Sequence, residues 1–400
     1  MTLPSSCAQV PMAAERSASS MAMDGPRYGV ASLAEVMPAV ASHLWPGAGR
    51  PGDARDVLGL PEARGYVLLL VDGLGWRQLR RELPGLNYFP HLLADAVELT
   101  CALPATTATS LTTLGTGLPP GRHGIVGYSF RERPGDARVL NTLAWDGQPD
   151  PFAYQPHPTW FERLAHHDVR VISVAPGHFE TSGLTLAGLR GSTFDPVGED
   201  ADVDSRLDRV VAATRPGRRC FVYLYERALD HVGHSLGTNT TQWRAALTAI
   251  DSYVERLREL LPPDVCLLIT GDHGMIDVPR DRQILVEDHP QLMAQVDVLA
   301  GEGRLRQLYT RRPDDVAATW REVVGERGEV LTRTQAIDRN WFGPVEDRVR
   351  PRLGDVLVAM RGNWAVMTRA LAHELTLVGQ HGSLTPEEIE VPLLIDAGEP

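Results

Sequence analysis

The chain has 400 residues, is 43% hydrophobic and carries a formal net charge of −12, which suits one large α/β domain or a domain with an inserted cap. The acidic balance argues against binding to duplex nucleic acid. All 39 lysine-or-arginine positions hold arginine, which excludes Schiff-base chemistry and the lysine of a Walker phosphate loop.

Residues 1–25 are predicted to form a mobile N-terminal tail. They lack the basic start and apolar stretch of a secretory signal, and no run in the chain is long enough to span a bilayer. We therefore expect a cytoplasmic protein without a membrane partner. The sequence carries no signal for an oligomeric state.

Residues 26–400 are predicted to form a single catalytic domain. Helical spacing of apolar residues appears first at 33–45 and again at 241–260. Short apolar runs typical of buried strands lie at 66–71, 169–176, 220–225, 265–270 and 391–396. Strands that alternate with helices predict an α/β fold with a mostly parallel central sheet and helices on both faces. Residues 278–373 mix both patterns and are predicted to be a smaller α+β insertion that resembles a cap.

The four cysteines form no Cys-x-x-Cys pair. The sequence therefore indicates neither a disulfide framework nor a thiolate metal site. Cys220 and Cys266 lie in apolar runs, and we expect both of them in the core.

Three of the apolar runs are followed by a carboxylate. Asp72 ends one run directly, Asp230 follows another by about one helical turn, and Asp272 follows a third by two residues. Ligands of open parallel sheets bind outside the carboxyl ends of the strands, so these carboxylates are predicted to gather at one edge. Taken singly, an aspartate after a strand is more often a turn former or a helix cap.

Histidines accompany these carboxylates. Asp230 and His234 are spaced i, i+4, so on a helix they point the same way. Asp272 and His273 are adjacent, and the glycines on both sides of the pair would let a loop turn both side chains toward one centre. His381 stands between glycines just before the last apolar run.

These residues make a set of three carboxylates and three imidazoles without a thiolate. Such oxygen and nitrogen donors suit two divalent transition ions, with Zn²⁺ as the first choice and Mn²⁺ or Fe as alternatives. A hydroxyl beside such ions could act as a nucleophile. The threonine-rich stretch at 103–124, LPATTATSLTTLGTGLPPGRHG, supplies several hydroxyls.

The motifs and their order resemble the alkaline phosphatase superfamily, and most closely its nucleotide pyrophosphatase/phosphodiesterase branch. The resemblance covers about residues 65–394. It rests on five motifs in family order: LVDGLG, PATT followed by TGLPPGRHGIVG, DHVGHSLG, GDHGM and GQHGS.

The resemblance implies a phosphoric ester hydrolase that cleaves phosphate diesters or pyrophosphate bonds through a phospho-threonine intermediate. Thr107 aligns with the nucleophile, in preference to Thr106. One ion is then held by Asp72, Asp272, His273 and Thr107, and the other by Asp230, His234 and His381.

Two departures from the family pattern fall where the substrate binds. Gly127 and Tyr128 stand where an Asn-Asn pair is common, and Tyr128 could donate one hydrogen bond in place of an amide. Arg131 could reach a phosphate. A phosphomonoesterase with the same metal site is the first alternative, favoured by a cationic clamp such as Arg131, and a non-catalytic metal-binding scaffold is the second.

Overall fold

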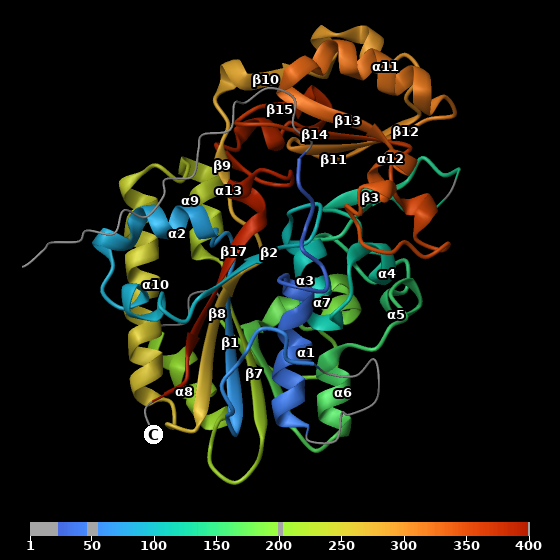
Figure 1. The fold of residues 1–400 in the computed structure, drawn as a ribbon. Coiled ribbons are helices and arrows are strands. Elements are labelled where there is room, and N and C mark those ends of the chain that lie inside the picture. The colour runs from blue at the N-terminus through green and yellow to red at the C-terminus, as the bar shows by residue number, and fades with distance from the viewer. Residues whose placement is uncertain (1–22, 46–54, 134, 199–202, 399–400) are drawn as a thin grey trace, which may run out of the picture.

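The computed structural model describes residues 23–45, 55–133, 135–198 and 203–398 (Figure 1). Most of the predicted N-terminal tail, residues 1–22, lies outside the described residues. None of the described helices is both long and apolar enough to cross a bilayer.

A seven-stranded sheet forms the centre of the molecule. Its strand order is β2-β17-β8-β1-β7-β5-β6, and the strands span Val97–Thr100, Glu390–Asp396, Val265–Gly271, Gly65–Val71, Cys220–Glu226, Arg170–Pro176 and Thr193–Val197 respectively. The pairs among β8, β1, β7, β5 and β6 are parallel, whereas β17 runs antiparallel to both of its neighbours. The predicted mostly parallel sheet is confirmed, and its one reversed strand is the apolar run at 391–396.

Helices cover both faces of this sheet because successive side chains of each strand point to opposite faces. Tyr66, Leu68 and Leu70 of β1 share a hydrophobic cluster with one group of helices, and the intervening residues share another cluster with the opposite group. The first group is α1 (Leu33–Leu44), α3 (Thr107–Thr116), α6 (Trp160–His166) and α7 (Gly183–Gly188). The second is α2 (Trp76–Glu82), α8 (Val203–Ala213), α9 (Ala228–Leu236) and α10 (Thr241–Leu260). Cys220 and Cys266 are buried as expected.

A smaller antiparallel sheet lies above the large one in the view of Figure 1. Its order is β11-β12-β14-β13, with bounds Val298–Glu302, Leu305–Tyr309, Val356–Met360 and Gly328–Thr332. Helix α11 (Pro313–Val324) packs against it through the buried Trp320. All of these elements fall within 278–373.

Short elements complete the fold. The two-stranded pairs are β3 (Ser129–Arg131) with β4 (Val139–Asn141), β9 (Ile276–Asp277) with β16 (Gly379–Gln380), and β10 (Gln283–Leu285) with β15 (Ala365–Met367). The short helices are α4 (Pro120–His123), α5 (Pro151–Tyr154), α12 (Arg333–Asp338) and α13 (Pro386–Ile389).

Two buried ion pairs join the smaller sheet to the segment that leads into β17. Arg304, in the turn before β12, donates to both carboxylate oxygens of Glu388 in α13, at 3.0 and 2.6 Å. Arg306 of β12 pairs with Glu374. Both arginine side chains are fully buried, so these contacts tie the smaller sheet to the segment that precedes β17.

Candidate active site

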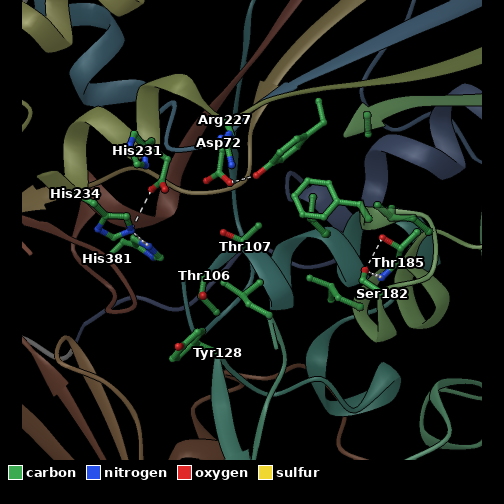
Figure 2. A pocket seen from close by; sticks show the side chains of 18 of the residues that line it. Asp72, Thr106, Thr107, Tyr128, Ser182, Thr185, Arg227, His231, His234 and His381 are labelled. Atoms are coloured by element: carbon green, nitrogen blue, oxygen red, sulfur yellow. Dashed lines mark hydrogen bonds and ion pairs between the residues drawn. The ribbon is translucent and has the colours of Figure 1, made fainter. Parts of the chain in front are cut away.

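The candidate site lies at the carboxyl ends of three adjacent parallel strands. Strand β1 lies between β7 and β8, so Asp72 after β1, Asp230 in the helix after β7 and Asp272 after β8 meet at one edge. In the view of Figure 2, Thr107 lies between His234 and His381 on one side and Ser182 and Thr185 on the other, with Asp72 above it. The sheet order thus brings together residues that are far apart in the sequence.

The first cluster consists of Asp72, Asp272 and His273, whose ligand atoms all lie within 4.8 Å of one another. The Nε2 atom of His273 is 3.4 Å from Asp72 Oδ1 and 3.5 Å from Asp272 Oδ2. Thr107 Oγ1 lies 3.3 Å from the same Nε2. Asp272 and His273 are fully buried, so this cluster forms the floor of the site.

The second cluster consists of Asp230, His234 and His381, again within 4.8 Å of one another. His234 Nε2 is 3.3 Å from Asp230 Oδ1 and 3.3 Å from His381 Nε2. The Asp230 and His234 side chains retain 18% and 24% of their exposure. This cluster therefore faces the solvent-accessible side, where water and a leaving group can reach it.

Backbone carbonyls orient all three imidazoles. The Nδ1 atoms of His234, His273 and His381 lie 2.8, 2.8 and 2.7 Å from the carbonyl oxygens of Gly379, Gly274 and Ala105. A carbonyl oxygen only accepts, so each Nδ1 carries the proton. In its neutral form each ring then presents the lone pair of Nε2 to its cluster, as in metal-ligating histidines.

The carboxylates also present unpaired oxygens. Asp72 Oδ1, Asp230 Oδ1 and Asp272 Oδ2 are buried and form no hydrogen bond with any described residue. Buried polar atoms are rarely left unpaired without a functional reason. Together with the imidazole lone pairs, they make two sets of donors that lack a positive partner, which fits a cation in each cluster.

The electrostatics of the clusters agree with this fit. Burial, followed by the charges of Asp272 and Asp230, raises the pKa of Asp72 well above its usual range. Burial likewise raises the pKa of Asp272. Burial and the neighbouring imidazoles hold the pKa of His381 well below its usual range. A bound divalent cation would lower the pKa values of these carboxylates again, because it favours their charged form.

Thr107 is the first residue of α3, and Thr106 is its N-cap residue. The Thr106 side chain forms no capping hydrogen bond with the first turn of this ten-residue helix. The positive end of the helix dipole and the first-turn N–H groups therefore point toward the place where a phosphate would meet Thr107 Oγ1.

A cavity of about 520 Å³ opens beside Thr107, and Tyr128 lines it. The Tyr128 hydroxyl accepts a hydrogen bond of 2.8 Å from Asn141, which leaves its own proton to donate. Arg131 is absent from the described residues that line the cavity. Its guanidinium lies over the Tyr309 ring, 4.5 Å from the centroid, and its contact with a phosphate stays a prediction.

Three further groups at the site were missed from the sequence. The Tyr225 hydroxyl donates a hydrogen bond to Asp72 Oδ2, and Arg227 and Glu302 line the cavity. Tyr225 had a usable signal, because Tyr223 and Tyr225 alternate on a strand and so share the face of the sheet that carries the site. Nothing in the sequence pattern separates Glu302 from an ordinary surface acid.

The glycines around Asp272 and His273 act differently from what we expected. Their φ angles are not in the left-handed region. A Cβ on Gly271 would lie 2.1 Å from the Leu74 carbonyl oxygen, and one on Gly274 would lie 2.0 Å from that of Glu387. These glycines are thus required by close backbone approach rather than by conformational freedom.

Comparisons with known proteins were made with both sequence and structure. A family model described as type I phosphodiesterase / nucleotide pyrophosphatase matches residues 66–384. No curated protein matches the sequence at a significant level.

Solved structures share the fold at low identity. Murine ectonucleotide pyrophosphatase/phosphodiesterase 5, in an inactive form bound to AMP, has a TM-score of 0.65 and 16% identity, over 82% of this chain and 87% of that one. Phosphonoacetate hydrolase from Sinorhizobium meliloti 1021, bound to phosphonoacetate, has a TM-score of 0.63 and 19% identity, over 84% and 91%.

Proposed function

Because the chain belongs to the type I phosphodiesterase / nucleotide pyrophosphatase family of phosphoric ester hydrolases, we propose that it hydrolyses phosphate diesters or pyrophosphate bonds through a phospho-threonine intermediate. The observation that carries this proposal is the convergence of two Asp/His clusters beside one hydroxyl, Thr107, at the start of a helix.

The residues present fit two divalent cations, for which we propose zinc. Asp72, Asp272 and His273 would hold one ion together with Thr107, and the second cluster would hold the other. When bound, such ions lower the pKa of a coordinated hydroxyl or water and neutralise charge on phosphate oxygens. The donor set contains no thiolate, and this agrees with a hydrolytic site.

The chain's own groups then account for the displacement. Thr107 Oγ1 forms a bond to phosphorus while the bond between phosphorus and the leaving oxygen breaks. Water later cleaves the Thr107 phosphoester and regenerates the hydroxyl. The first-turn N–H groups of α3 and the Tyr128 hydroxyl are placed to donate hydrogen bonds to phosphate oxygens as negative charge develops on them.

The lining of the cavity favours a diester over a monoester. A monoester brings one more negative charge, and Arg131, the residue suggested as a clamp for that charge, packs on the Tyr309 ring. Arg227 is the one arginine among the described lining residues. We therefore propose phosphodiesterase activity as the principal function.

The test compares bis(p-nitrophenyl) phosphate with p-nitrophenyl phosphate, using purified protein whose metal content is measured by mass spectrometry. We expect the diester to be hydrolysed with the higher kcat/KM, and we expect a chelator to abolish the reaction. A higher kcat/KM for the monoester would select the phosphomonoesterase alternative. Substoichiometric metal without chelator-sensitive hydrolysis would select the scaffold alternative.

A further inference from the structure

One wall of the cavity beside Thr107 is built from apolar side chains of α3, α7, β5, β6 and their connections. We call this wall the apolar lobe and define it by Leu111, Ala175, Phe179, Leu184, Leu189 and Phe194. All of these residues belong to, or pack against, one hydrophobic cluster of the core. The lobe is therefore a continuation of the core that opens toward the reacting group.

The polar side chains on the same elements are largely bonded to each other. Ser173 of β5 pairs with Ser192 through their hydroxyls at 2.7 Å. Ser182 donates to Thr185 Oγ1 at 3.0 Å and accepts from the Thr185 backbone N–H at 3.2 Å. A substrate that brings several polar groups into the lobe would find few partners for them, and unpaired buried polar groups are costly.

The Tyr223 hydroxyl is an unpaired polar group of the cavity, as are Glu302 Oε1 and Gln380 Nε2. It comes from β7, the strand next to β5, is buried and forms no hydrogen bond with any described residue. It can donate to a single oxygen next to phosphorus, such as an ester oxygen. This hydroxyl would contact the ester oxygen of a substrate, and the apolar lobe would contact the substituent that this oxygen carries. The pair of features therefore fits an apolar group joined to phosphorus through one ester link.

An apolar side chain also lies where the cavity opens to solvent. Leu143, which lines the cavity, is 55% exposed. An exposed apolar side chain thus belongs to the lining of the cavity, as expected at a binding site for apolar ligands.

We propose that the substrate is a phosphate ester with an uncharged aryl or alkyl substituent, which enters the apolar lobe while phosphorus lies at Thr107. The inference rests on the proposed hydrolase function and specifies its substrate class. Burial of an apolar substituent in the lobe is favourable because it removes apolar surface from water. A nucleoside substituent would bury hydroxyl and amide groups against side chains that offer them little.

The test uses three p-nitrophenyl diesters with the same leaving group, whose second substituent is methyl, phenyl or thymidin-5′-yl. We expect kcat/KM for the phenyl ester to exceed that for the methyl ester by about tenfold or more, and the thymidine ester to remain below the phenyl ester. Equal values for phenyl and methyl, or a preference for thymidine, would overturn the proposal.

Two variants of the lobe test whether the preference for the phenyl ester arises there. Ala175→Phe fills the lobe and Leu184→Gln adds an unpaired amide to it, so in each we expect the phenyl-to-methyl ratio of kcat/KM to fall toward one. Leu260→Gln, at an exposed site at the end of α10, is the matched control and should keep the ratio. An unchanged ratio in both folded lobe variants would contradict the assignment.

Binding without turnover separates this inference from the proposed function. Calorimetric titration of metal-loaded Thr107→Ala protein with phenylphosphonate and methylphosphonate should show tighter binding of the phenyl compound. If none of the three esters is hydrolysed but this preference is present, the hydrolase proposal fails and the lobe assignment stands. If the esters are hydrolysed but the phenyl and methyl compounds bind equally well, the hydrolase proposal stands and the lobe assignment fails.

Discussion

At the scale of single residues, the proton on each imidazole decides what the site can do. Because backbone carbonyls accept from Nδ1 of His234, His273 and His381, the rings offer only Nε2 to the clusters. Reversed rings would present N–H donors there and could not bind cations. Hydrogen bonds to the backbone thus orient the three rings with Nε2 toward the clusters even without a bound ion.

Replacement of the proposed nucleophile gives the first prediction. Thr107→Ala should lower kcat for a diester on the order of 10⁴-fold or more, because the attacking oxygen is lost. Metal content should remain nearly unchanged, since Asp72, Asp272 and His273 are retained. Thr106→Ala is the neighbouring control and should keep most of the turnover; the reverse pattern would identify Thr106 as the nucleophile.

The hydrogen bond from Tyr225 to Asp72 gives the second prediction. Tyr225→Phe removes the donor that orients this carboxylate, and loss of such a support typically weakens metal binding about 10- to 100-fold. Competition with a chromogenic chelator measures the change. Tyr253→Phe, in α10 and outside the site, is the control and should leave the metal affinity unaltered.

The residues of the two clusters were predictable because each follows a recognisable strand or stands in a glycine-framed motif. Tyr225 could be placed on the face of the sheet that carries the site, but its hydrogen bond to Asp72 could not be predicted, because it depends on which neighbour the side chain meets across the sheet. Glu302 was not predictable, because its place in the cavity depends on how the insertion packs. Arg131 is near the site in sequence, and its guanidinium lies over the Tyr309 ring.

At the scale of elements, the last strand was predictable as a strand but not in its direction. A buried strand has the same apolar residues whether it pairs parallel or antiparallel with its neighbour. The residues at 391–396 therefore do not predict that β17 pairs antiparallel with β8. The insertion explains the reversal, because the chain returns from the smaller sheet at the carboxyl edge and enters β17 from there.

The buried pair that anchors this return gives the third prediction. Glu388 accepts from Arg304, from the Ser383 N–H and from the Thr385 hydroxyl, so it holds the segment that follows His381. Arg304→Met leaves a buried carboxylate without its partner and should lower the free energy of unfolding by about 3–5 kcal/mol. Chemical denaturation measures this loss.

A surface pair supplies the control for that experiment. Arg312 and Asp315 form an ion pair with side chains 65% and 50% exposed. Arg312→Met should change the free energy of unfolding by no more than about 0.5 kcal/mol. Similar losses in the two variants would mean that the Arg304 pair has no special role in stability.

At the scale of the whole molecule, the buried carboxylates couple stability to pH. Above its usual pKa of 3.8, Asp72 keeps a proton in the folded chain that it loses in the unfolded chain. The folded state then binds more protons, so the free energy of unfolding of metal-free protein falls as the pH rises through this window. His381, whose pKa is lowered, acts in the opposite sense, but only below its usual value of 6.5.

This balance gives the fourth prediction. Between pH 6.5 and 8.5 the Tm of chelator-treated protein should fall, while metal-loaded protein should change less because the ions favour the charged carboxylates. The gap between the two Tm values should therefore widen with pH, as followed by calorimetry. A non-zero gap that stays constant over this range would contradict the coupling between carboxylate protonation and metal binding, and equal Tm values would show that the folded protein binds no cation.

The long separation between Asp72 and His381 also bears on synthesis. A growing polypeptide can assemble the Asp72, Asp272 and His273 triad once His273 has left the ribosome, but the partner triad waits until His381 emerges. We expect the reactive geometry to appear only once His381 has been made and strand β17, which follows it, can pair with β8.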